Sequence, residues 1–174
     1  MMSKPAAQRV SLNGVVTTAV PTPWRFILMG GVGAGKTTLL RALEQKDPTT
    51  TRKTQMVDYA GWGIDTPGEF VEMGHWRRIL VSVSFDAQLI VAVQDATRAD
   101  SYFPPHYFMT FPQQTIGVIT KTDAPQANRE RATAVLRAAG VTGEIYCVSA
   151  LTGCGISKLR DDLLNQNVLE KRRI

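Results

Sequence analysis

The chain has 174 residues, 44% of them hydrophobic, which suits one compact domain with a single core. Its 20 Lys and Arg exceed its 15 Asp and Glu, but no basic block with interleaved aromatic residues occurs, so we expect no nucleic-acid partner. Two cysteines cannot form a disulfide framework, and no apolar run approaches the ~20 residues of a membrane helix, so we expect a cytoplasmic protein without a membrane partner.

Residues 1–24 differ from the rest in being rich in Ser, Thr, Val and Pro and in lacking acidic side chains. We interpret them as a flexible N-terminal arm before a domain over residues 25–174. Several apolar residues in the arm fall at helical spacing, which is the pattern of a short docking helix: Leu12, Val15, Val16, Ala19 and Val20. Because Gly14 and the β-branched residues after it are poor helix formers, the unordered arm is the favoured interpretation.

From residue 25 onward, short apolar runs alternate with longer amphipathic segments, a pattern typical of parallel strands joined by crossover helices. Strands are predicted over residues 25–29, 56–59, 63–64, 89–94, 116–120 and 145–148. Helices are predicted over residues 36–45, from Pro67 to about residue 83, over 126–139 with Gly140 as the stop, and over 156–168. The sequence therefore predicts an α/β fold.

Residues 30–37 fit the pattern G-x-x-x-x-G-K-[ST] between a predicted strand and a predicted helix. The glycines let backbone N–H groups turn inward around a phosphate, and the helix presents its positive dipole end to the same anion. We expect Lys36 to reach the β and γ phosphates and the Thr37 hydroxyl to bind Mg²⁺. The sequence predicts a P-loop for the magnesium complex of a nucleoside triphosphate, formed by Gly30, Gly31, Val32, Gly33, Ala34, Gly35, Lys36, Thr37 and Thr38.

The segment Asp65-Thr66-Pro67-Gly68 follows a short extended run. An acidic residue at Asp65 can hold Mg²⁺ directly or through water, and the Gly68 N–H can face the γ-phosphate. The pattern D-x-x-G is common, so an ordinary loop is an equally good interpretation of this segment alone.

Two later segments end predicted strands: Thr120-Lys121-Thr122-Asp123 and Ser149-Ala150-Leu151. The Asp123 carboxylate can accept both N–H donors of guanine, a pair that adenine lacks, while the stem of Lys121 lies along the base. The Ala150 N–H can donate to the guanine oxygen. Each segment alone is also typical of an ordinary loop, but all these motifs fall at the carboxyl ends of predicted strands, on one rim of the sheet.

The order of the four motifs resembles that of the G-protein superfamily over about residues 25–168. Within it, residues 53–55, 64–70 and 93–97 are most similar to the EutP/PduV family of ethanolamine and propanediol utilisation. The resemblance implies a three-layer P-loop NTPase domain with a mostly parallel six-stranded sheet. It also implies a bacterial cytosolic setting and an association with microcompartments, the protein shells that confine aldehyde-producing pathways.

Two features differ from a signalling G protein. Only residues 55–64 separate Thr54 from Asp65, so we expect a shortened switch region. Thr54 resembles the switch threonine that completes the Mg²⁺ shell, and Thr49, Thr50 and Thr51 compete for that assignment. Glu69 stands where Ras-like proteins carry a water-orienting glutamine, and its carboxylate would repel the γ-phosphate, so we expect slow hydrolysis.

The leading hypothesis is a GTPase-like switch that binds GTP and GDP with Mg²⁺. Its catalytic residues are Lys36, Thr54, Gly68 and Glu69, its metal residues are Thr37, Thr54 and Asp65, and its base site adds Thr120, Lys121, Asp123, Ser149, Ala150 and Leu151. The resemblance leaves open an ATP-dependent acetate kinase that uses the same phosphate clamp. A third hypothesis is a non-catalytic, nucleotide-stabilised module that docks on a microcompartment shell or enzyme through the N-terminal arm.

One further segment is rich in aromatic residues. We expect it to pack under a loop, with a partner-binding patch as the alternative: Tyr102, Phe103, Tyr107, Phe108 and Phe111.

Overall fold

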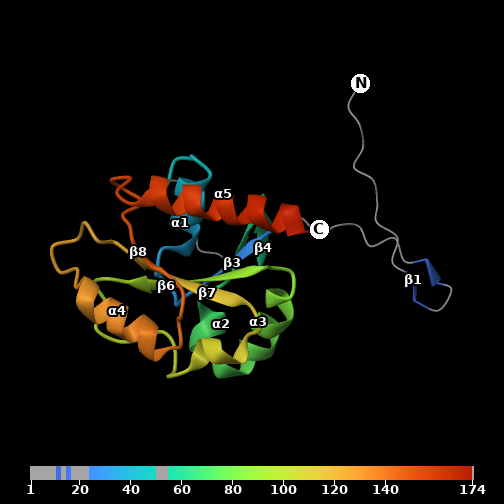
Figure 1. The fold of residues 1–174 in the computed structure, drawn as a ribbon. Helices are drawn as coiled ribbons and strands as arrows, with labels where there is room; N and C mark the ends of the chain where they lie inside the picture. Colours follow the sequence, from blue (N-terminus) through green and yellow to red (C-terminus); the bar gives the residue numbers. More distant parts are fainter. Residues whose placement is uncertain (1–10, 13–14, 17–23, 50–54, 174) are drawn as a thin grey trace.

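The computed structural model describes residues 11–12, 15–16, 24–49 and 55–173 (Figure 1). Its main sheet has six strands in the order β4-β5-β3-β6-β7-β8. Their bounds are β3 Phe26–Met29, β4 Asp58–Ala60, β5 Gly63–Asp65, β6 Leu89–Asp95, β7 Gln114–Thr120 and β8 Ile145–Cys147. Among the described strands of this sheet, only β4 runs antiparallel to its neighbour, so the predicted mostly parallel sheet is confirmed.

Helices cover both faces of this sheet. They are α1 Lys36–Leu43, α2 Glu69–Glu72, the 3-10 helix η1 Gly74–Trp76, α3 Arg77–Ser84, the 3-10 helix η2 Tyr107–Thr110, α4 Arg129–Ala138 and α5 Ile156–Arg173. Figure 1 shows α1 and α5 on one face of the sheet and α2, α3 and α4 on the other. The predicted three-layer P-loop architecture is therefore confirmed.

The core lies between these layers. All residues of β3 and β6 are buried, as expected for central strands covered by helices on both faces. Burial of one large apolar side chain contributes about 1.5–3 kcal/mol, so the central strands are the stable frame of the sheet. Parallel strands carry their carboxyl ends to one rim, and the predicted motifs follow those ends.

The segment after Pro67 differs from the single predicted helix. It is divided into α2, η1 and α3 because Met73 has an extended backbone (φ −102°, ψ 104°) and Gly74 follows it. The next predicted helix is confirmed as α4, whose first turn is capped by the Asn128 side chain, which accepts the Arg131 N–H at 2.8 Å. It stops before Gly140, as predicted. The strands β4 and β5 are short, as the shortened switch region required.

Near the N-terminus, β1 (Ser11–Leu12) pairs antiparallel with β2 (Val15–Val16). The docking-helix interpretation is therefore wrong for these residues, because β-branched Val15 and Val16 favour extended structure. The other residues before Trp24 lie outside the described ranges. Trp24 itself is buried and packs beside Phe26. None of the helices in the described part of the chain has the length and apolar character needed to span a bilayer.

Candidate functional site

The predicted phosphate loop, residues 30–37, joins the carboxyl end of β3 to α1. Gly35 precedes α1 in a left-handed conformation (φ +87°) that favours glycine, and no side chain caps the helix there. The amino end of α1, where the helix dipole is positive, therefore lies at this loop, as the dipole argument requires. Gly31 is packed against the Tyr102 ring so closely that a Cβ would lie 1.7 Å from a ring carbon. Any larger residue would displace the ring or the loop.

The Lys36 side chain is folded back onto this loop. Its ammonium donates to Gly30 O at 2.7 Å and to Gly31 O at 3.0 Å, and the residue is only 6% exposed. Burial lowers the pKa of Lys36 to about 8, while the negative charges of three nearby carboxylates act in the opposite direction: Asp65, Glu69 and Glu72. A phosphate that took the place of these two carbonyl oxygens would contact a buried cation at the centre of the loop.

The residues predicted to bind Mg²⁺ lie together where the structure describes them. The Thr37 hydroxyl donates to Asp65 Oδ2 at 2.5 Å, and the Thr66 hydroxyl fixes the Asp65 segment by donating to Leu28 O at 2.6 Å. A hydroxyl beside a carboxylate provides the oxygen donors that Mg²⁺ prefers, with the remaining ligands coming from phosphates and water. Thr54, the third predicted ligand, lies outside the described residues. Across the described ranges, no cluster of three or more His, Cys, Asp or Glu could hold a metal by itself.

The D-x-x-G segment packs directly on the phosphate loop. A Cβ on Gly68 would lie 2.3 Å from Val32 N and 2.5 Å from Gly31 C, so only glycine permits this approach. Glu69, which is half-buried, begins α2 at this point. The loop and the start of α2 therefore form one surface, which places the predicted γ-phosphate residues beside Lys36.

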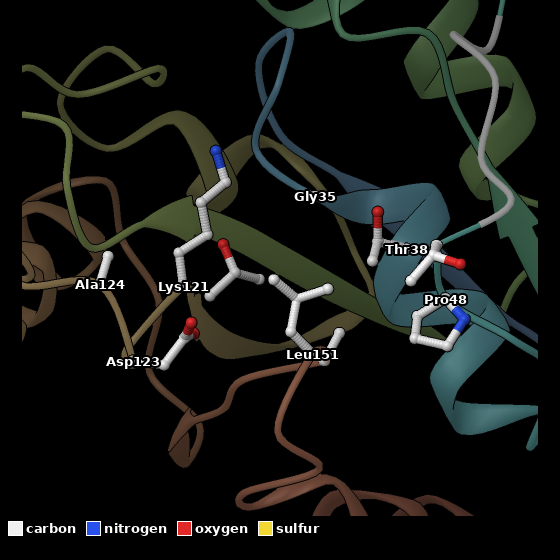
Figure 2. A pocket seen from close by; sticks show the side chains of 10 residues that line it. Gly35, Thr38, Pro48, Lys121, Asp123, Ala124 and Leu151 are labelled. Carbon is white, nitrogen blue, oxygen red and sulfur yellow. The ribbon is translucent and has the colours of Figure 1, made fainter.

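A cavity of about 420 Å³ adjoins the loop (Figure 2). It is lined by Gly35, Thr38, Pro48, Thr49, Thr120, Lys121, Asp123, Ala124, Ala150 and Leu151. Figure 2 shows Lys121 and Asp123 on one side of the cavity and Thr38 and Pro48 on the other. Its volume falls within the roughly 300–1,000 Å³ of small-molecule sites. The base residues predicted from two separate motifs thus line one pocket.

Ser149 contributes differently from its neighbours. It is buried and does not line the cavity. Its hydroxyl accepts the Thr152 N–H at 3.1 Å, and its carbonyl accepts the Gly153 N–H at 2.9 Å. Ser149 therefore shapes the turn that presents Ala150 and Leu151 to the cavity.

Sequence reasoning missed Asp95, which ends β6 on the same rim. Its carboxylate accepts Lys121 Nζ at 2.6 Å and, on the other oxygen, both the N–H and the hydroxyl of Thr97. Burial alone would raise the pKa of Asp95, but hydrogen bonds from Lys121 and Thr97 hold it below its ordinary value of 3.8. The available signal was the rule that strand ends on this rim carry functional side chains.

Tyr102 was also missed as a site residue. Its ring covers Gly31, its hydroxyl lies 3.4 Å from Val32 O, and the Arg98 guanidinium lies 4.5 Å from its ring centroid. The aromatic segment as a whole is buried, which confirms that it packs inside the protein: Tyr102, Phe103, Tyr107, Phe108 and Phe111. No local pattern indicated which of these rings would reach the loop.

Comparison with known proteins gives the family. A family model described as "Ethanolamine utilisation - propanediol utilisation" matches residues 24–165. "Probable acetate kinase EutP" of Escherichia coli (strain K12) is 39% identical over 106 residues, which cover 60% of this chain and 66% of that relative. The protein of the same name from Salmonella typhimurium is 37% identical over the same shares. "Propanediol utilization protein PduV" of Citrobacter freundii is 26% identical over 135 residues, 78% of this chain and 89% of the relative.

The match thus spans just under two thirds of the length of the two EutP relatives. The family model itself covers both the phosphate loop and the residues that line the cavity. The chain belongs to the PduV-EutP family of ethanolamine and propanediol utilisation proteins.

Proposed function

We propose that this chain binds a purine nucleotide with Mg²⁺ and acts as a GTPase-like switch. One observation carries the proposal: a phosphate loop around the buried Lys36 opens beside a cavity that contains Asp123 and Lys121. The Thr120 hydroxyl joins the two halves by donating to Ala34 O at 2.7 Å. A phosphate site beside a base site is what a nucleotide requires.

Each residue has a role that follows from its position. Lys36 neutralises the β and γ phosphates, while the first amides of α1 hold their oxygens. Thr37 and Asp65 would hold Mg²⁺, which would supply positive charge against the phosphates. Asp123 accepts the two guanine donors, and the stem of Lys121 lies along the base.

Binding should be tested by calorimetry with GTP, GDP, ATP and ADP, each with Mg²⁺ and with a chelator. We expect association with the guanine nucleotides, weaker association with the adenine ones, and a loss of triphosphate affinity without Mg²⁺. A folded chain that gives no heat with any of the four would overturn the proposal.

Hydrolysis is proposed to be slow. Glu69 is one of the carboxylates around Lys36, so its charge would oppose the γ-phosphate that water must attack. The test is a single-turnover assay with GTP and no partner protein. A rate in the range of ordinary enzymes, about 1 per second or more, would refute this part of the proposal.

The names of the two EutP relatives favour a second candidate, phosphoryl transfer to acetate. In that reaction the bond between the γ-phosphorus and the β,γ-bridging oxygen breaks, and a bond from phosphorus to an acetate oxygen forms. The same clamp at Lys36 and Mg²⁺ would serve it, but Asp123 suits guanine better than adenine. Incubation with acetate and either triphosphate, followed by trapping of acetyl phosphate with hydroxylamine, separates the two candidates.

A third proposal concerns location. We place the chain at a bacterial microcompartment, with the N-terminal arm as the docking segment. Deletion of residues 1–23 should remove recruitment to the shell and leave nucleotide binding unchanged. The deletion stops before Trp24 because that residue is part of the core. Recruitment that survives the deletion would assign docking to another surface.

A further inference from the structure

A second cavity, of about 490 Å³, lies between η1, α3 and η2. It is lined by Gly74, Arg77, Arg78, Val81 and Thr110. None of these residues lines the cavity beside the phosphate loop. Its volume is large enough to hold several side chains of a bound molecule. It is therefore a candidate site separate from the proposed nucleotide site.

Arg77 is held in one position at this cavity. One of its terminal nitrogens donates to the Thr110 hydroxyl at 3.1 Å, and its guanidinium carbon lies 5.0 Å from the centroid of the Tyr107 ring. Burial raises the pKa of Tyr107 to about 12, so the ring stays neutral. A guanidinium has five N–H donors, and among the described residues only Thr110 accepts one of those of Arg77. The side chain is thus oriented and still has donors for an anion.

Arg78 adds a second positive charge. It is exposed and forms no ion pair with a carboxylate of the described residues. No acidic residue lines the cavity. Glu72 is the acidic residue nearest to Gly74 in the chain, and its carboxylate accepts the Val32 N–H at 2.8 Å. The charge of the two guanidinium groups is therefore not neutralised within the cavity, which favours an anionic occupant.

The borders of the cavity are apolar. Val81 lines it directly. Met73 precedes Gly74 in the chain and is 48% exposed, and Met109 precedes Thr110 and is 70% exposed. Arginine and methionine are both enriched where proteins bind one another, and methionine side chains adapt to different partners. This surface suits a segment that carries carboxylates and apolar side chains together.

We propose that the cavity docks an acidic segment of another protein, with Arg77 and Arg78 binding its carboxylates and Val81 contacting its apolar side chains. The N-terminal arm cannot be the occupant, because residues 1–23 contain no Asp or Glu. Two arginines also fall short of the about 4–8 basic residues of an anionic-lipid site, and a concave surface suits a peptide better than a membrane. The inference goes beyond the proposed function and does not require nucleotide.

The test is a titration of the ¹⁵N-labelled full-length chain, followed by NMR, with a peptide blocked at both ends: Ser-Glu-Leu-Glu-Phe-Asp-Ser. We expect the signals of the Gly74 amide and of the Arg77 and Arg78 side-chain N–H groups to shift, with Kd of about 1 mM or lower. The same peptide with Gln for Glu and Asn for Asp should bind at least about tenfold more weakly, because it lacks the carboxylates.

Two variants test the surface without altering the packed residues. Arg78→Glu reverses an exposed charge and should raise Kd at least about tenfold. Gly74→Leu should abolish binding by filling the cavity, since a Cβ at Gly74 would meet no other atom within 4 Å. Arg129→Glu, at an exposed position at the start of α4, makes the same charge change outside the cavity and should leave Kd unchanged. The amide spectrum of each variant verifies its fold.

Three results would overturn the proposal. The first is the absence of shifts at the cavity with about 5 mM peptide, well above the expected Kd. The second is equal affinity in Arg78→Glu and Arg129→Glu. The third is loss of the Gly74, Arg77 and Arg78 signals on addition of vesicles that contain phosphatidylserine, in a chain that the peptide does not affect, which would assign the surface to an anionic membrane.

Discussion

Thr120, at the end of β7, donates its hydroxyl to the carbonyl of Ala34 in the phosphate loop across 2.7 Å. Both residues are buried, so this hydrogen bond is protected from water. It joins the strand end that leads into Lys121 and Asp123 to the loop that surrounds Lys36. This buried hydrogen bond therefore links the proposed base site to the proposed phosphate site inside the protein.

Thr120→Val removes this donor and keeps the side-chain shape. Because Ala34 O is then buried without its partner, we expect the free energy of unfolding to fall by about 1–2 kcal/mol. We also expect Kd for GDP to rise by about fivefold to tenfold, a change of about 1 kcal/mol. Urea unfolding and calorimetry measure the two effects. Thr115→Val, at the other end of the same strand and also buried, is the control for the loss of a hydroxyl and should leave Kd unchanged.

Nucleotide affinity should depend on pH through Lys36. Burial lowers its pKa to about 8 in the nucleotide-free chain, whereas a bound phosphate favours the ammonium form and raises it again. Binding above pH 8 must therefore take up a proton, and affinity should fall by up to about tenfold per pH unit there. Calorimetry in buffers of different ionisation heats measures the uptake directly. Lys36→Arg stays charged, so its weaker binding should show no such dependence.

The same shift affects the stability of the nucleotide-free chain in the opposite direction. The folded-state pKa of Lys36 lies below the ordinary value of 10.5, so between about pH 8 and 10.5 the unfolded chain binds more protons at this residue. Stability attributable to Lys36 should therefore rise with pH over that window.

The binding prediction has its own contradicting outcome. If nucleotide affinity is constant between pH 7 and 9 both in the unaltered chain and in Lys36→Arg, then Lys36 is not the group whose protonation controls binding.

Much of the fold was predictable because its main signals are local. The runs that became β6 and β7 are dense in Ile and Val and are almost entirely buried, so both the strands and their burial could be predicted. The division at Met73 could not. The extended backbone there accompanies the stacking of Phe70 on Trp76, a tertiary contact that periodicity does not encode.

In the candidate site, too, some features could be predicted from the sequence and others could not. Motif spacing predicted that Lys36, Asp65 and Asp123 lie at one rim of the sheet, and the fold brings them there. The contacts made by Tyr102 and Glu72 arise from segments that fold back onto the loop, and no local pattern specifies which side chain arrives. Their chemical roles, like those of the motif residues, stay predictions until nucleotide binding is measured.

Guanine selectivity should depend on Asp123. Asp123→Asn replaces an acceptor-only carboxylate with an amide that can accept one guanine donor but opposes the other with its own N–H. We expect GDP affinity to fall by about 2–3 kcal/mol, roughly 30-fold to 150-fold, with ADP affinity changed little. A xanthine nucleotide, which carries an oxygen in place of the guanine amino group, should bind the variant better than it binds the unaltered chain. Asp161→Asn, at an exposed position of α5, is the control, and equal losses for GDP and ADP would refute base recognition by Asp123.

The ion pair between Asp95 and Lys121 yields the last prediction. Asp95 is buried while the Lys121 side chain is 45% exposed, so the carboxylate holds the terminal ammonium of a side chain that is otherwise partly in solvent. Asp95→Asn keeps an oxygen for Thr97 and removes only the charge. We expect a loss of about 0.5–1 kcal/mol in the free energy of unfolding at neutral pH, small because one partner is solvated.

The pH dependence of that loss identifies its cause. The folded-state pKa of Asp95 is held below 3.8, so its contribution is complete above that pH and disappears as the pH falls through the lowered value. The difference in stability between the unaltered chain and Asp95→Asn should therefore shrink in acid, as urea unfolding at about pH 7 and about pH 3 would show. A difference that persists undiminished at the lower pH would mean that the substitution disturbs the Thr97 turn and not the charge on Lys121.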